Sequence, residues 1–185
     1  TRELIIDDYI YQIKRLANPA VSSPIYGLMS YYILGFKEYG DSLPKGLANK
    51  NSFIDLRKYP LKGVKKLDDY TFEITLKGQY TQFLFWLAMP FFAPVPWEAD
   101  LFYSQKDMDD KNLSFGWYPI GTGPFMLTEN NPNRSMILEK NPNFREVYFP
   151  VNGSDADRRA GYLTNLGRRL PLIDKAVYTL EKESI

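Results

Sequence analysis

The 185-residue sequence contains no cysteine and no histidine. These absences exclude disulfides, thiolate and imidazole metal sites, and any Cys–His or Ser–His catalytic pair within this chain. An excess of one charge is also missing: 23 basic and 22 acidic residues give a formal net charge of +1, so no overall field attracts nucleic acid or anionic lipid. The longest apolar run, residues 83–92, contains Pro90 and is too short for a membrane span. We therefore expect no metal, no cofactor, no nucleic-acid partner and no membrane span.

Aromatic residues are abundant instead, with 14 Tyr, 12 Phe and 3 Trp. Two explanations stay open: an aromatic-rich core, or side chains that are half exposed in a cleft or at an interface. The length suits one domain, or one domain with part of another, and is sufficient to bury a core.

The first forty residues predict two helices. Apolar residues recur at helical spacing over residues 6–17, Asp7 and Asp8 suit the positive N-terminal end, and Asn18-Pro19 ends the helix. A second helix is expected to begin after the cap-like residues 22–24 and to run toward Phe36. Proline and glycine leave no clear pattern over residues 40–63.

The middle of the chain predicts a β-hairpin and two further helices. Apolar and polar residues alternate over residues 70–77, after a turn at Asp68-Asp69 and a preceding short strand, so one face of the strand should be buried and the other exposed. Residues 81–89 are apolar on nearly every side of a helix, and we expect that helix to be buried almost all round. Trp97, after three prolines, is expected to start a short helix.

Residues 117–145 combine a glycine loop, a strand, a tight turn and a second strand. Gly121 and Gly123 flank Thr122 and precede Pro124, so the backbone there can adopt positive φ or pass close to a partner. The alternation on both sides of the turn at residues 130–133 predicts a β-hairpin. Together with a strand within residues 172–180, the pattern predicts an α+β fold, with packed helices and a mixed or antiparallel sheet.

These segments resemble the family 5 extracellular solute-binding proteins, which are the peptide, oligosaccharide and nickel receptors of ABC importers. That family carries a G-T-G-P-[FYW] loop and an E-[KR]-N-P-[DN]-[YF] segment, matched here by residues 121–125 and 139–144. Its hairpin and "P-[VI]-P-x-E-A" patterns are matched by Val64, Asp68, Thr71, Phe72, Ile74, Leu76, Pro94, Val95, Pro96, Glu98 and Ala99. Arg145 departs from the pattern, because the family usually has tryptophan or a similarly large residue there.

The resemblance implies a two-lobed, type II-like periplasmic-binding-protein fold, of which this chain is an internal part. Residues 1–118 would form most of the smaller inserted lobe, and residues 119–185 the hinge crossover and the strands that return to the lobe formed by the chain ends. Residues 146–171 form a polar insertion. Its arginine pairs, Arg158-Arg159 and Arg168-Arg169, either grip a carboxylate or phosphate of a ligand or lie in a solvated loop.

The implied function is capture of peptides by an extracytoplasmic receptor, periplasmic or on the cell surface of a bacterium, which acts as a monomer with the permease subunits of an ABC transporter. Oligosaccharide and nickel chelate are alternative ligands, and a non-enzymatic protein-interaction module is the alternative function. We expect no enzyme, because adjacent acids such as Asp68-Asp69 and Asp109-Asp110 have no assignable base or nucleophile.

The candidate ligand contacts are Trp117, Tyr118, Gly121, Thr122 and Gly123 in the hinge loop. Trp97 is a second aromatic candidate. Exposed main-chain groups of such a loop suit a peptide held in strand-like fashion. The alternative is that residues 121–124 serve only the reversal of the chain.

Overall fold

The computed structural model describes residues 2–44, 53–108 and 110–181. The chain divides into two compact units, Thr1–Phe115 and Gly116–Ile185. Both contain antiparallel strand pairs, and the first unit adds packed helices, so the expected α+β fold is confirmed.

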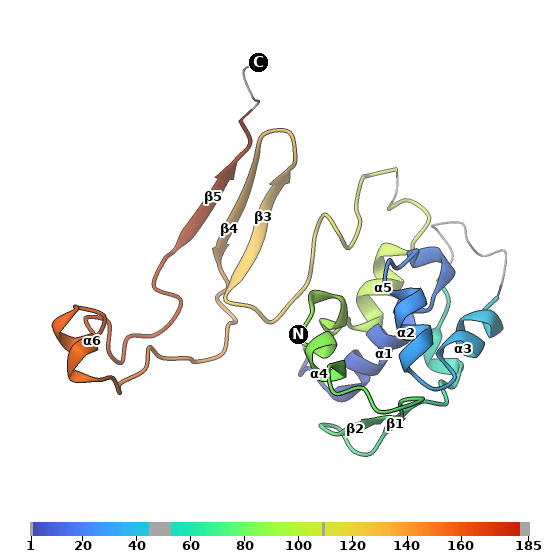
Figure 1. Ribbon diagram of the computed structural model, residues 1–185. Helices are drawn as coiled ribbons and strands as arrows, with labels where there is room; N and C mark the ends of the chain where they lie inside the picture. The colour runs from blue at the N-terminus through green and yellow to red at the C-terminus, as the bar shows by residue number, and fades with distance from the viewer. Residues whose placement is uncertain (1, 45–52, 109, 182–185) are drawn as a thin grey trace. The chain divides into compact units, whose positions relative to one another are not determined.

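The first unit is mainly helical (Figure 1). Its α-helices are α1 (Ile6–Leu16), α2 (Tyr26–Tyr32), α3 (Phe36–Ser42), α4 (Phe83–Leu87) and α5 (Trp97–Tyr103). Three 3-10 helices, η1 (Pro19–Val21), η2 (Leu56–Lys58) and η3 (Pro90–Phe92), connect them, and β1 (Val64–Lys66) pairs antiparallel with β2 (Phe72–Ile74). The predicted first helix, the hairpin and the helix that begins at Trp97 are confirmed.

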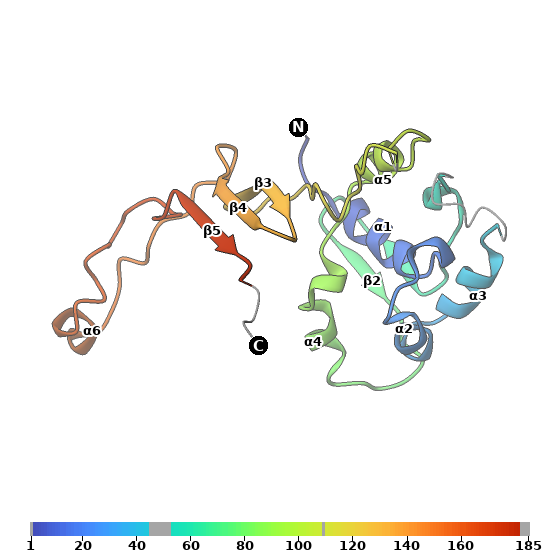
Figure 2. The ribbon, with the colours of Figure 1, turned by 90° about the horizontal axis from the view of Figure 1, so that it is seen from above.

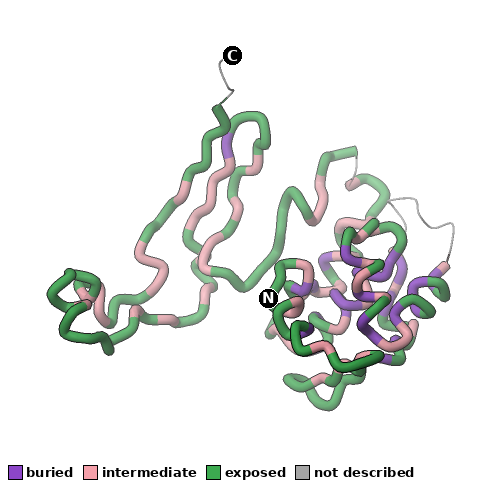
Figure 3. Tube along the Cα trace, in the orientation of Figure 1, coloured by how far each residue is buried: buried purple, intermediate pink, exposed green. Residues whose placement is uncertain are grey.

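Helix α1 forms where the sequence predicted it, for the expected reasons. Asp7 and Asp8 lie in its first turn, Lys14 and Arg15 lie in its last turn, and each pair suits the helix dipole at its end. Its buried face joins the core of the first unit (Figure 3). The most enclosed side chains of this core come from α1, α2, α3, η2 and the residues directly after α2 and α3: Ile13, Met29, Ile33, Phe36, Leu43 and Leu56.

The second predicted helix is interrupted, and α3 was not predicted. Gly35 has a positive φ of 72° and separates α2 from α3. A Cβ on Gly40 would lie 2.8 Å from the hydroxyl oxygen of Tyr26, so this glycine permits close packing of α3 against α2. The sequence showed no clear pattern from Gly40 onward, whereas in the fold Gly40 is a contact point between two helices.

The expectation that the helix of residues 81–89 is buried almost all round is wrong for the described residues. Helix α4 has only five residues and buries Phe83, whereas Leu84 and Phe85 are 74% and 77% exposed. Phe83 packs against Tyr32, with ring centroids 6.1 Å apart. A helix of fewer than two turns that packs on one layer leaves its other face uncovered.

The second unit is a three-stranded antiparallel sheet with a long connection. Strands β3 (Phe125–Asn131), β4 (Ser135–Lys140) and β5 (Lys175–Thr179) lie in the order β3-β4-β5, and the register shifts between Leu127 and Glu129. The predicted hairpin and last strand are confirmed. The turn is fixed by Asn131, whose carbonyl oxygen accepts from the N–H of Arg134 at 3.0 Å. The connection from β4 to β5 contains α6 (Asp155–Arg159).

Candidate ligand-binding sites

The loop of residues 117–124 is tied to the β3–β4 hairpin at both ends. The Asn130 amide donates to the carbonyl oxygen of Trp117 at 3.2 Å, and the Asn141 amide donates to that of Gly123 at 2.9 Å. The backbone N–H of Asn141 also donates to the carbonyl oxygen of Pro124 at 2.9 Å. Asn141 belongs to the E-K-N-P segment, so the two matched motifs of this unit contact each other.

Between these ties the loop is solvent-exposed, with Trp117 39% and Tyr118 49% exposed. Neither Gly121 nor Gly123 adopts a positive φ, so of the two possibilities given by the sequence, positive φ or close approach to a partner, the first is not realised. Within the described part of the chain, a Cβ built on either glycine meets no atom within 4 Å. The second unit itself therefore does not require glycine at these two positions.

The N–H groups of Gly121, Thr122 and Gly123 make no hydrogen bond to the described residues. A run of exposed, unpaired main-chain donors is the feature that an extended peptide uses when it binds in strand-like fashion. Five of the six predicted contact residues thus lie in one exposed loop of the second unit.

The sixth, Trp97, lies in the first unit and lines a cleft of about 620 Å³. The Arg57 guanidinium lies over the Trp97 ring, with its carbon 3.6 Å from the ring centroid, in the geometry of a cation–π contact. Asp55 fixes that guanidinium by accepting from Nε at 2.8 Å and from Nη2 at 3.0 Å. The other lining residues are Arg2, Glu3, Ile5, Asp7, Ile10, Tyr11 and Lys14.

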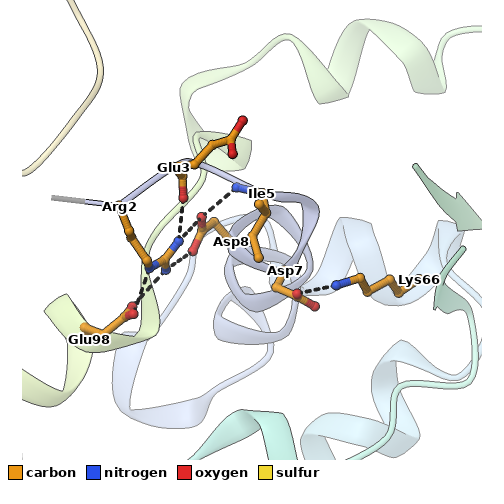
Figure 4. A network of polar contacts seen from close by, with 7 residues as sticks. All are labelled: Arg2, Glu3, Ile5, Asp7, Asp8, Lys66 and Glu98. Carbon is orange, nitrogen blue, oxygen red and sulfur yellow. Dashed lines mark hydrogen bonds and ion pairs between the residues drawn. The ribbon is translucent and has the colours of Figure 1, made fainter. Parts of the chain in front are cut away.

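One rim of this cleft is a charged network around Arg2 (Figure 4). Its guanidinium donates to both carboxylate oxygens of Asp8, at 2.6 and 2.9 Å, and to both of Glu98, at 2.8 and 2.9 Å. Asp8 is almost fully buried and also accepts from the N–H of Ile5 at 3.1 Å. The hydrogen bonds from Arg2 hold the pKa of Glu98 below its usual range. Glu98, matched by the family motif, therefore ties α5 to the start of α1.

Two polar residues that line the cleft, Tyr11 and Lys14, have hydrogen-bond partners within the protein. Tyr11 donates to Asp100 at 2.7 Å, and burial, followed by the Asp100 charge, raises the pKa of the Tyr11 hydroxyl. Lys14 donates to the carbonyl oxygen of Leu56 at 3.2 Å, and burial lowers the pKa of its ammonium group. These partners favour a binding surface rather than a set of proton-transfer groups.

Arg57 and Lys14 were not predicted as site residues. Arg57 lies forty positions before Trp97, and no local pattern relates the two. Within the described ranges there is no cluster of three or more acidic, histidine or cysteine residues that suits a metal ion. In the same part of the chain, no helix is long and apolar enough to cross a membrane.

The chain is similar to known proteins in sequence and in fold. The model of "Bacterial extracellular solute-binding proteins, family 5 Middle" matches residues 2–183. The periplasmic oligopeptide-binding protein OppA of Salmonella typhimurium is 27% identical over 177 residues, which are 89% of this chain and 29% of that protein. The probable deoxycholate-binding periplasmic protein YgiS of Escherichia coli is 25% identical over 148 residues, which are 80% of this chain and 24% of that protein.

The solved structure of a periplasmic oligopeptide-binding protein, OppAIV of Borrelia burgdorferi, has the same fold. Its TM-score is 0.56 at 24% identity, and the match covers 89% of this chain and 31% of that one. The chain thus spans about 30% of the length of these relatives. Since the family model covers nearly every residue, the chain belongs to the family 5 bacterial extracellular solute-binding proteins.

Proposed function

We propose that the protein is the extracytoplasmic receptor of an ABC importer and that it captures peptides without chemical change. The observation that carries this proposal is the family match over residues 2–183, joined to a relative named as oligopeptide-binding that aligns with 89% of this chain. Because the chain spans only part of that relative, the receptor would be a longer protein. Its location would be periplasmic or cell-surface, and it would act as a monomer with membrane permease subunits.

The loop of residues 117–124 is the proposed peptide contact. Its ends are held by Asn130 and Asn141, while the N–H groups from Gly121 to Gly123 are exposed and unpaired among the described residues. A peptide bound through its main chain needs no particular side chain, which suits a receptor of broad specificity. The glycines would then serve the approach of the ligand backbone, since the second unit does not require them.

Under this proposal, residues 1–118 belong to the smaller inserted lobe, and residues 119–185 begin with the hinge crossover. The observed boundary between compact units, after Phe115, lies three residues before the proposed one. Ligand would act by favouring a closed arrangement of the lobes, which the permease recognises. Trp97 supports a second contact, because its ring lines a cleft of the first unit and is held by Arg57.

A thermal-shift screen of the full-length protein tests the proposal. The panel contains peptides of two to six residues, oligosaccharides, a nickel chelate and deoxycholate, the last because one relative carries that name. A ligand that binds only the folded state raises the free energy of unfolding by RT ln(1 + [L]/Kd), or about 2.7 kcal/mol at a hundredfold excess over Kd, and therefore raises the melting temperature. We expect a shift with peptides. A shift with another class alone would contradict peptide capture but keep the receptor function.

A further inference from the structure

The connection between β4 and β5, residues 146–171, is a folded arm that the proposed peptide contact does not use. Its two sides pair antiparallel at the base: the N–H of Leu170 donates to the carbonyl of Val147 at 2.8 Å, and that of Phe149 to the carbonyl of Arg168 at 2.9 Å. Figures 1 and 2 both show α6 at the far end of this arm, away from the β3–β5 sheet of the same unit.

The tip of the arm has a defined shape. Ser154 and Asp157 form a capping box at α6, in which the Ser154 hydroxyl accepts from the N–H of Asp157 at 3.2 Å and the Asp157 carboxylate accepts from the N–H of Ser154 at 2.9 Å. A Cβ on Gly153 would lie 2.6 Å from a methyl carbon of Leu163, so the chain packs closely there because residue 153 is glycine. Gly161 and Gly167 adopt positive φ, which suits the turns that return the chain.

This shape is built without a core, since none of residues 146–171 is buried. Tyr148, Val151 and Tyr162 are 51%, 65% and 70% exposed. Exposed tyrosine side chains favour contact with a partner, because each combines a large apolar ring with a polar hydroxyl.

The arm, residues 146–171, carries a small net positive charge. It contains four arginines and three acidic residues, Glu146, Asp155 and Asp157. Arg168 is bonded to Asn165 at 2.7 Å, and Arg169 lies 3.9 Å from Glu146. Arg158 and Arg159, in α6, are exposed and form no ion pair with a described residue.

We propose that this arm docks the receptor on an acidic protein surface, that of the importer's permease, with Arg158 and Arg159 on its carboxylates and Tyr162 against it. The proposal rests on the proposed receptor function. Arginine and tyrosine are the residue types that dominate binding at protein interfaces, and a guanidinium fork matches a carboxylate. An anionic membrane is a weaker fit, because each basic residue near a lipid surface contributes only modestly to the attraction and the arginines of the arm exceed its acidic residues by one.

The test uses the full-length receptor with its own permease and ATPase subunits. The variant is the double charge reversal Arg158→Glu/Arg159→Glu. The matched control, Lys106→Glu/Arg134→Glu, also replaces two positive side chains by negative ones, but at exposed positions outside the arm. Peptide Kd is measured by calorimetry, and docking by the peptide-dependent ATPase rate and by uptake. We expect the arm variant to keep its Kd within twofold and to lose at least tenfold in ATPase stimulation and uptake, while the control keeps both. Tyr162→Ala is expected to lower uptake in the same way.

The outcomes separate this proposal from the receptor function. Unchanged uptake by the arm variant would overturn the docking role, and so would an equal loss in the control. A tenfold rise in peptide Kd for the arm variant would place the arginines on the ligand instead. Binding of the wild type, but not the variant, to phosphatidylglycerol vesicles would indicate a membrane contact. Absence of peptide binding by the wild type would overturn the receptor function itself, and the docking role with it.

Discussion

Replacing Arg2 by alanine tests whether the network beside the Trp97 cleft stabilises the first unit. Among the described residues, the change leaves the Asp8 carboxylate, 4% exposed, with only the Ile5 N–H as a partner. Removing one partner of a buried ion pair costs about 3–5 kcal/mol. Arg2 itself is 40% exposed, so solvent screens part of the interaction. We therefore expect Arg2→Ala to lower the free energy of unfolding by about 2–3 kcal/mol.

The structure also predicts an asymmetry between the two carboxylates. Glu98 is 45% exposed, so Glu98→Ala should cost about 1 kcal/mol or less, as exposed ion pairs do. In a double-mutant cycle of Arg2→Ala with Asp8→Ala, the costs should fall short of additivity by more than about 1 kcal/mol, because the second change removes the charge that the first left unpaired.

Native-state hydrogen exchange of the α1 amides in the full-length protein is the suitable assay, because it reports the opening free energy of one region when global unfolding is not two-state. The control is Lys37→Ala, which removes an exposed i,i+4 pair with Asp41 at 2.7 Å and should leave the exchange of the α1 amides almost unchanged, because solvent screens an exposed ion pair. The reasoning is refuted if Arg2→Ala costs no more than this control.

Three further predictions concern pH and glycine. The pKa of Glu98 is held below its ordinary value of 4.5, so its contribution to stability is complete above pH 4.5 and is lost as the pH falls through the lowered value; the melting-temperature difference between wild type and Glu98→Gln should shrink accordingly in an acid titration. Burial and Asp100 raise the pKa of Tyr11 above 10.0, so the contribution of the Tyr11 hydroxyl to folding stability is complete below pH 10 and is lost at higher pH. In thermal melts, Tyr11→Phe should therefore lessen the destabilisation that alkaline pH causes. Gly63→Ala places a Cβ 2.3 Å from the Leu34 carbonyl oxygen and should lower the free energy of unfolding by more than about 1 kcal/mol. Gly121→Ala, by contrast, should change the melting temperature by less than about 1 °C. Equal changes in melting temperature for the two alanine variants would contradict the described backbone.

The parts of the fold that follow from local sequence were predictable. Helix α1 has a periodic apolar face, acidic residues at its start and Asn18-Pro19 at its end, and the β3–β4 hairpin has alternation on both sides of an asparagine-rich turn. Both signals depend on neighbours within a few residues.

The failures concern contacts between distant residues. Whether α4 is covered depends on what packs against Leu84 and Phe85, and the local pattern reports only that they are apolar. The pattern is unclear from Gly40 onward, and no local signal shows that the hydrogen of Gly40 faces the Tyr26 hydroxyl fourteen positions earlier. The surroundings of Trp97 likewise depend on Arg57 and on the Arg2–Glu98 contact across 96 positions, which no spacing rule anticipates.

Isothermal titration of the full-length protein, freed of bound ligand by unfolding and refolding, tests peptide capture most directly. The titrant is an uncharged-side-chain tripeptide such as Ala-Phe-Ala, and the comparison is the same titration into the variant Gly121→Val/Gly123→Val. The account predicts one site per chain with a Kd of about 10 μM or below for the wild type, and at least tenfold weaker binding for a variant whose melting temperature is unchanged. No peptide binding by the refolded wild type, together with binding of an oligosaccharide, a nickel chelate or deoxycholate, would contradict it.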